Sequence, residues 1–135
     1  MSTDNFRDVG EFHARFGLPN ANGGNIKPRV LDEDLLQFRT KFMYEELNEF
    51  EDAATGGSLE GMADALVDLV YVAMGTAHLM GLPWEELWNE VQRANMTKVR
   101  AARAEDSKRG STYDVVKPEG WTPPDIAGVL ARHMA

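Results

Sequence analysis

The chain has 135 residues, a length that fits one domain over residues 1–135 and leaves little core to divide between two. Its 22 acidic residues against 14 lysines and arginines leave a net charge of -8, which disfavours binding to a nucleic-acid polymer or an anionic membrane. The absence of cysteine excludes disulfides and thiolate metal sites. Together with an N-terminus that does not resemble a secretory signal, it predicts a cytoplasmic protein.

Apolar residues recur at helical spacing in the first part of the chain. Those between Phe6 and Phe16 predict a short helix that stops at Gly17. Residues 19–28 are rich in asparagine and glycine, so they predict an irregular connection. A second helix is expected over about residues 32–54, and a pair of glycines ends it.

The third predicted helix begins at Ser58, a good N-cap, and runs towards Gly81. Its apolar surface is wide, so we expect it at the centre of the fold. The stretch from Gly61 to Trp84 is apolar enough to suggest a membrane span, but two aspartates and a histidine interrupt it. The preferred interpretation is therefore a buried core helix with no membrane partner.

Pro83 starts a fourth predicted helix, which we expect to fray near Ala104. The following tract to residue 120 is polar and rich in turn formers, and Thr122 to Asp125 resembles the cap and first turn of a short terminal helix. Little in the sequence indicates a sheet. The predicted fold is all-α, a helical bundle of about five helices.

Three glutamates gather in the second predicted helix. Glu46 and Glu49, at i and i+3, share one face of that helix, while Glu45 and Glu49, at i and i+4, share an adjacent face. Like charges at these spacings repel, so either solvent or a divalent cation must offset the cost. Taken alone, this motif is better explained as a solvated acidic face.

Two aspartates in the third predicted helix are more informative. Asp64 and Asp68 are the only formally charged residues between Gly61 and Trp84, and their i, i+4 spacing makes them face one partner. Aspartate is almost never fully buried without compensation, which a bound cation would provide. The alternative is a solvated first turn in which Asp68 pairs with an arginine.

The short connection between these two helices can bring both carboxylate sets to one point. Carboxylates without cysteine or histidine favour Mg²⁺ or Mn²⁺ over zinc, and the absence of a Glu-x-x-His pair disfavours a di-iron centre. The sequence therefore predicts a site for a hard cation.

Polar and cationic groups also occur further along the chain. Asn95 and Lys98 lie at the end of the fourth predicted helix, and Lys117 precedes Trp121 in a constrained loop. Both lysines could meet phosphates. Equally, Lys98 could complement the negative end of a helix dipole, and Trp121 could simply hold the terminal helix in place.

Five ordered blocks that cover most of the chain resemble the all-α nucleotide pyrophosphohydrolases of the MazG- and HisE-like superfamily. The similarity is to its short phage and bacterial phosphoribosyl-ATP pyrophosphohydrolase-like branch, with MazZ-like enzymes among the candidates. The blocks are Glu45-Glu46-x-x-Glu49, Asp64-Ala-Leu-Val-Asp68-Leu-Val-Tyr71-Val, Gly75-Thr76-Ala77 followed by Gly81-Leu-Pro, Val91-x-Arg93-Ala-Asn95-Met-x-Lys98, and Lys117-Pro-Glu-Gly-Trp121.

The resemblance implies hydrolysis of nucleoside triphosphates to monophosphates and pyrophosphate, with Mg²⁺ or Mn²⁺ bound by an E-x-x-E pair and an E-x-x-D pair. Glu46 and Glu49 match the first pair. In the second pair Asp68 matches the final aspartate, but Ala65 stands where glutamate is usual. Asp64, one residue earlier on the same side of the helix, is the expected substitute.

The resemblance also implies roles for individual residues. The expected metal ligands are Glu46, Glu49, Asp64 and Asp68. The expected catalytic residues are Glu46 and Glu45, of which Glu45 either binds metal or orients the attacking water. The expected nucleotide contacts are Arg39, Tyr71, Asn95, Lys98 and Lys117, although Tyr71 could be an ordinary core aromatic. Phe12 and His13 could contact a base, but a packed helix face is the better explanation for them.

The predicted function is a deoxynucleoside triphosphate pyrophosphohydrolase of nucleotide-pool control or phage nucleotide metabolism. Hydrolysis of dGTP in 2-aminoadenine synthesis is one specific version. A dUTP-directed or house-cleaning enzyme is one alternative, and a non-catalytic, metal-binding helical oligomer is another. The apolar surface of so short a bundle and the family both predict a homodimer or homotetramer.

Overall fold

The computed structural model describes residues 4–135, which fall into two compact units, residues 4–83 and 84–133. The first unit contains α1 (Asn5–Arg15), the 3-10 turn η1 (Asn22–Gly24), α2 (Glu33–Thr55) and α3 (Leu59–Leu79). The second contains α4 (Trp84–Asn95), β1 (Val99–Arg100), η2 (Ala104–Asp106), β2 (Val115–Val116) and α5 (Ile126–Ala131). The predicted all-α class with five helices is confirmed, while the single domain stays a prediction.

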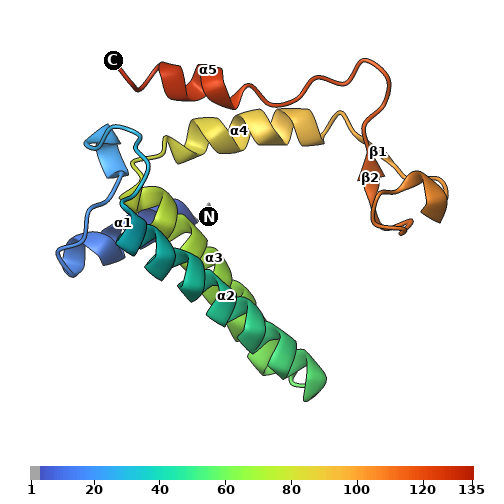
Figure 1. Ribbon diagram of the computed structural model, residues 1–135, viewed down its shortest axis with the longest axis horizontal. Coiled ribbons are helices and arrows are strands. Elements are labelled where there is room, and N and C mark those ends of the chain that lie inside the picture. Colours follow the sequence, from blue (N-terminus) through green and yellow to red (C-terminus); the bar gives the residue numbers. More distant parts are fainter. Residues whose placement is uncertain (1–3) are drawn as a thin grey trace. The chain divides into compact units, whose positions relative to one another are not determined.

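Helices α2 and α3 form a long antiparallel hairpin, drawn in teal and green in Figure 1. Each begins at a side-chain cap: the Asp32 carboxylate accepts from the Leu35 amide at 2.9 Å, and the Ser58 hydroxyl accepts from the Gly61 amide at 3.0 Å. Gly57, with φ of +68°, makes the turn between them in a backbone conformation that favours glycine. Both helices lie within a residue or two of their expected bounds.

The contact face of α2 is unusual in its chemistry. The only buried residues in this 23-residue helix are Arg39 and Glu46, which stand two turns apart on the same face. Several of its large apolar side chains are instead well exposed, among them Leu36, Phe38, Tyr44 and Leu47. The apolar core of the hairpin therefore comes mainly from α3, through Ala65 and Val72.

Two buried histidines fasten α1 to α3. His78 is fully buried; its Nε2 donates to the Phe6 carbonyl at 2.6 Å, and its Nδ1 accepts from the Ala21 amide at 2.9 Å. His13 donates from Nδ1 to the Pro19 carbonyl at 2.8 Å. The bond from the Ala21 amide fixes the neutral form of His78, and the two histidines together hold the 18–22 connection against the helices.

Gly75 allows a close approach between three helices of this unit. A Cβ atom there would lie 2.6 Å from Arg39 Nη2 and 2.9 Å from His13 Nε2, closer than real Cβ contacts. The absence of a side chain therefore lets α1 and α2 meet the same turn of α3.

By length and composition α3 could cross a membrane, with a mean hydropathy of 1.2 and 39% of the relevant stretch buried. The core helix of a soluble protein has the same properties. Here α3 packs against both α1 and α2 and carries two aspartates and a fully buried histidine. These features agree with the expected core helix.

In the second unit, α4 ends earlier than expected. The prediction of a helix reaching Ala104 is wrong, because the Ala94 carbonyl accepts from Trp121 Nε1 at 2.8 Å and from Thr97 Oγ1 at 2.7 Å. Residues 99–100 then pair antiparallel with residues 115–116 in a two-stranded sheet that the sequence pattern did not predict.

The start of α5 also differs from the expectation. Asp125, whose carboxylate accepts from the Gly128 amide at 3.0 Å, is the N-cap. Thr122 instead accepts a 3.4 Å hydrogen bond from Arg93 of α4. Glu86 of α4 contacts Arg132 and His133 beyond α5, so the terminal helix is held along α4 by polar contacts.

Acid should destabilise the first unit because of its histidines. Burial is the main cause that lowers the pKa of both His13 and His78. The unfolded chain takes up protons below about pH 6.5 while the folded rings stay neutral, so stability falls as pH drops from about 6.5 towards the lowered folded pKa values. Denaturant unfolding followed by helical circular dichroism between pH 7.5 and 5.5 measures this.

The matched variants are His78→Gln and His133→Gln. His78→Gln should weaken the pH dependence in this window, whereas His133→Gln, which changes a histidine of the second unit, should keep it. A wild-type stability that is flat across the window would contradict the assignment.

Candidate functional site

Three carboxylates from two helices converge on the hairpin. Glu46 and Glu49 of α2 and Asp68 of α3 each offer an oxygen, and these oxygens lie within 4.8 Å of one another. The antiparallel hairpin creates this group, because the middle of α2 and the first half of α3 lie opposite each other. Three of the four expected metal ligands therefore lie together, and their role as ligands stays a prediction.

Glu46 has the environment that most distinguishes this group from a solvated acidic face. Its side chain is only 8% exposed, and its Oε2 is buried with no hydrogen-bond partner among the described residues. Burial raises its pKa, and the neighbouring Glu49 raises it further. A buried acceptor of this kind needs a proton or a cation to satisfy it.

The two aspartates differ in position. Asp68 is half-buried, and its pKa is raised first by burial, then by Asp64 and by Glu49. Asp64 is exposed and lies outside the group whose oxygens are within 4.8 Å of one another, although its charge acts on Asp68. Glu45 is exposed on the adjacent face of α2. The roles predicted for Asp64 and Glu45 stay predictions.

The donor set fits a hard divalent cation. Every ligand atom is a carboxylate oxygen, the type that Mg²⁺ and Mn²⁺ prefer, and one of them is a buried oxygen without a partner. A cation would also offset the like charges that raise the pKa of Glu46 and Asp68.

Arg39 lies two turns before Glu46 on the buried face of α2. Its Nε donates to Thr76 Oγ1 at 3.1 Å and its Nη2 donates to the Val72 carbonyl at 2.9 Å. Among residues 4–135 no carboxylate pairs with it, and burial lowers its pKa. The sequence suggested a nucleotide contact here, but not that this cation is buried and held by α3.

Tyr71 lies one turn beyond Asp68 and is half-buried. Burial and the charge of Asp8 raise the pKa of its phenol, so it stays a neutral donor. The Phe12 ring of α1 meets Tyr71 edge-on, with 5.4 Å between ring centroids. Tyr71 and Phe12 therefore form an aromatic contact beside the carboxylates. In the sequence, only the i, i+4 spacing of Phe12 and Phe16 indicated that aromatic rings would cluster here.

In the second unit the two predicted phosphate contacts gather around one indole. Lys98 Nζ lies 5.4 Å and Lys117 Nζ 4.9 Å from the ring centroid of Trp121. Neither lysine pairs with a carboxylate within the part of the chain that the structure describes. Asn95 is exposed at the last position of α4. Trp121 therefore donates a hydrogen bond to the end of α4, and the ammonium groups of both lysines lie against its ring.

A further polar cluster lies close by in the chain but has a structural explanation. Asp114 accepts from Ser107 Oγ and from Arg109 Nη1, both at 2.7 Å. These bonds, together with that from the Val115 amide, lower its pKa to about 2. The cluster is internally satisfied and orders the 107–115 loop.

The sequence profile of the phosphoribosyl-ATP pyrophosphohydrolase family matches residues 9–95. The chain belongs to this family. The family depends on divalent metal, and the matched region includes the three convergent carboxylates but neither Lys98 nor Lys117.

One viral relative also matches. The chain is 32% identical over 80 residues to an uncharacterized protein, L479, of Acanthamoeba polyphaga mimivirus. The alignment covers 58% of this chain and 31% of that protein, so the chain spans about a third of the length of the curated relative it matches.

Removing one charge from the carboxylate group should stabilise the metal-free protein. The raised pKa of Asp68 means that its ionised form is disfavoured on folding, so at pH 7.5 in EDTA the variant Asp68→Asn should melt a few degrees above wild type. Added MgCl₂ should raise the melting temperature of wild type and have less effect on the variant.

Glu51→Gln is the matched control, because Glu51 is an exposed carboxylate of α2 outside the group. Its melting temperature should follow wild type with and without magnesium. If Asp68→Asn melted below wild type in EDTA, repulsion among these carboxylates would not destabilise the metal-free protein.

Proposed function

We propose that the protein hydrolyses a nucleoside triphosphate to the monophosphate and pyrophosphate, with Mg²⁺ held by Glu46, Glu49 and Asp68. The observation that supports this most directly is the buried Oε2 of Glu46, which has no hydrogen-bond partner among residues 4–135 and lies beside two further carboxylates from α2 and α3. The membership of a pyrophosphohydrolase family gives the reaction type.

The carboxylates of α2 and α3 have different proposed roles. Bound Mg²⁺ would supply charge neutralisation of phosphate oxygens and acidification of water. Glu46 and Glu49 would hold the cation from α2, Asp68 would hold it from α3, and Asp64 would complete the set or bind through water. Glu45, exposed on the neighbouring face, would orient the attacking water by accepting one of its protons in a hydrogen bond.

The cationic residues would bind the substrate's anionic groups. Lys98 and Lys117 carry ammonium groups without carboxylate partners in the described chain, so they are available for phosphate oxygens. Asn95 would add a neutral donor. Arg39 would act from its buried position by balancing the charge of the carboxylate group, since two of its nitrogens are already occupied by α3.

The substrate is proposed to be a deoxynucleoside triphosphate in the cytoplasm, with dGTP in a phage 2-aminoadenine pathway as the specific version to test first. A dUTP-directed or house-cleaning activity is the competing version. Steady-state assays with the canonical deoxynucleotides, dUTP and an oxidised base separate them, because each version predicts a different preferred substrate.

Loss of one ligand should abolish most of the activity. With Mg²⁺ and the preferred nucleotide, Glu49→Gln and Asp68→Asn should each reduce kcat/KM by at least about 100-fold, because each removes a charged ligand rather than a supporting contact. Pyrophosphate release measures this, and Glu51→Gln should keep wild-type activity. If wild type turned over no nucleotide, or if both variants kept full activity, the proposed function would be wrong.

Asp64→Asn provides the finer test of the second pair. If Asp64 replaces the family's usual glutamate, this variant should require a higher magnesium concentration for half-maximal activity, with a smaller loss at saturating magnesium. An unchanged magnesium dependence would show that the site works without Asp64.

We also propose that the chain assembles as a homodimer or homotetramer through the other flank of the hairpin. Thr40, Met43, Tyr44 and Leu47 of α2 line an apolar hollow of about 280 Å³ with Leu69 of α3. Leu47 is 47% exposed and Tyr44 62% exposed, which is costly for a helix whose only buried residues are charged. A second hairpin packed there would give α2 the apolar burial it lacks.

A charge placed in this hollow should prevent assembly. Leu47→Glu should sediment as a smaller species than wild type at equal concentration in analytical ultracentrifugation. Val30→Glu, at a position 82% exposed and outside the helices, should sediment as wild type does. Wild type that sediments as a monomer, or a Leu47→Glu variant of unchanged size, would contradict this proposal.

A further inference from the structure

An aromatic patch adjoins the carboxylate group on the same side of α3. Asp64, Asp68, Tyr71 and Gly75 occur at i, i+4, i+7 and i+11, so they form one stripe along this helix. Helix α1 crosses the stripe just beyond the carboxylates: the Phe12 ring meets Tyr71, and the next residue of α1 packs at Gly75. The patch therefore begins one helical turn from Asp68.

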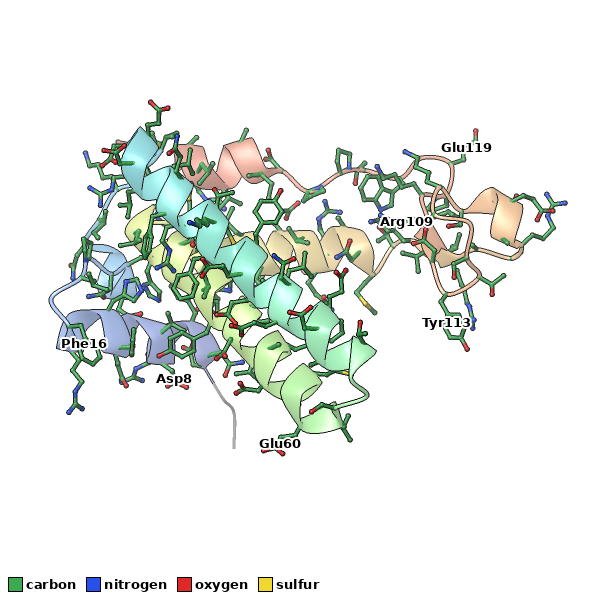
Figure 2. The ribbon with its side chains drawn as sticks, turned by 60° about the horizontal axis from the view of Figure 1, so that its bottom comes forward. Asp8, Phe16, Glu60, Arg109, Tyr113 and Glu119 are labelled. Carbon is green, nitrogen blue, oxygen red and sulfur yellow. The ribbon has the colours of Figure 1, made fainter. Side chains whose placement is uncertain are left out.

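The patch consists of three rings, with Phe12 in contact with both Phe16 and Tyr71. The Phe12 and Phe16 rings are 4.8 Å apart between centroids, and Phe12 and Tyr71 are 5.4 Å apart. Phe12 is 44% exposed and Phe16 is 61% exposed. Figure 2 shows Phe16 at the end of α1 and Asp8 on the same helix towards its start.

Folding of this unit does not account for the exposure of these rings. The core face of α1 is made by Val9, Gly10 and His13, and Phe16 touches no ring except Phe12 among the ring contacts of the described residues. Single exposed phenylalanines are ordinary, but a contiguous aromatic surface beside a polar site is typical of ligand binding.

We propose that Phe12, Phe16 and Tyr71 form the platform on which the base of the nucleotide substrate stacks. This inference rests on the proposed function and adds a determinant of substrate class to it. Asp68, the α3 carboxylate of the convergent group, and Tyr71 are three residues apart, which is about 4.5 Å along α3. A substrate with its phosphates at the carboxylates can therefore place a ring at the other end of the stripe.

The chemistry of the platform defines what it selects. Its rings offer π-faces, and stacking on such faces accepts any planar heteroaromatic base. The platform thus favours nucleotides over phosphate compounds that lack a base, and by itself it discriminates weakly between bases.

The test compares substrates with and without a base. In Phe16→Ala, KM for a deoxynucleoside triphosphate should rise about 10-fold while kcat stays near the wild-type value, because stacking contributes equally to the ground and transition states. The inhibition constant of inorganic tripolyphosphate, measured against the same substrate with Mg²⁺, should be unchanged. Phe12→Leu should behave in the same way as Phe16→Ala.

Tyr113→Ala is the control, since Tyr113 is an aromatic residue of the second unit that is 93% exposed and has the Arg100 guanidinium over its ring. It should leave KM, kcat and the inhibition constant unchanged. Phe16 is the principal test position because its truncation leaves the contacts of Phe12 with α3 in place.

Several results would overturn the platform. One is an unchanged KM in both Phe16→Ala and Phe12→Leu; another is an equal loss of tripolyphosphate inhibition, which would indicate a general disturbance of the phosphate site. A change in sedimentation coefficient with KM unchanged would instead assign the patch to contact with a second copy.

The platform can also be tested separately from catalysis. If wild type hydrolysed no nucleotide, the proposed function would fail, and calorimetric titration with deoxynucleoside monophosphates would still measure the platform. Binding by wild type that weakens about 10-fold in Phe16→Ala would support the platform without turnover. If wild type neither hydrolysed nor bound any nucleotide, both the platform and the proposed function would be wrong.

Discussion

The interface between α2 and α3 depends on two buried charges of opposite sign. Arg39 and Glu46 are the only buried residues of α2, and removing each from water costs several kcal/mol unless bonds replace the lost hydration. Arg39 recovers those bonds from Thr76 and from a carbonyl of α3, whereas Glu46 Oε2 recovers none within the described chain. The buried polar atoms of this face are therefore hydrogen-bonded at the Arg39 end, whereas Oε2 at the Glu46 end has no partner within the described chain.

The rest of the first unit supports this arrangement. Because the α2 face contributes little apolar burial, α3 must be held in place by α1, and His13 and His78 do so through short hydrogen bonds to carbonyls of α1 and of the 18–22 connection. Gly75 brings Arg39 and His13 to one turn of α3. A helix interface whose buried α2 residues are both charged is more typical of a cation-binding site than of a hairpin with a structural role alone.

Charge is distributed unevenly along the sequence. Residues 84–135 contain eight acidic and eight basic side chains, so the net charge of -8 arises entirely from residues 1–83. The carboxylate group lies in this acidic part, where a bare triphosphate would be repelled. Binding of an anionic substrate therefore has to follow or accompany cation binding, which reverses the local sign of the potential.

Local signals in the sequence predicted much of this fold, because they act within one turn. The Ser58 cap and the glycine pair after α2 indicated the hairpin, and the spacings of Glu46 with Glu49 and of Asp64 with Asp68 indicated its three convergent carboxylates. The end of α4 was missed because Trp121, 27 residues away, binds the Ala94 carbonyl. The burial of Arg39 was missed for the same reason: its partners belong to another helix.

The two flanks of the hairpin follow from the same two residues. Once Arg39 and Glu46 face α3, the 100° step per residue turns Glu45 and Glu49 to one side of α2 and Met43 and Leu47 to the other. On the first side, the carboxylates, Tyr71 and the α1 aromatics adjoin; on the second, an apolar hollow is lined by residues of both helices. Repulsion within the carboxylate group lowers the stability of the metal-free hairpin, while burial of the apolar hollow would raise it. The contacts that the proposed assembly would add therefore lie on the opposite side of α2 from the repulsion that they would offset.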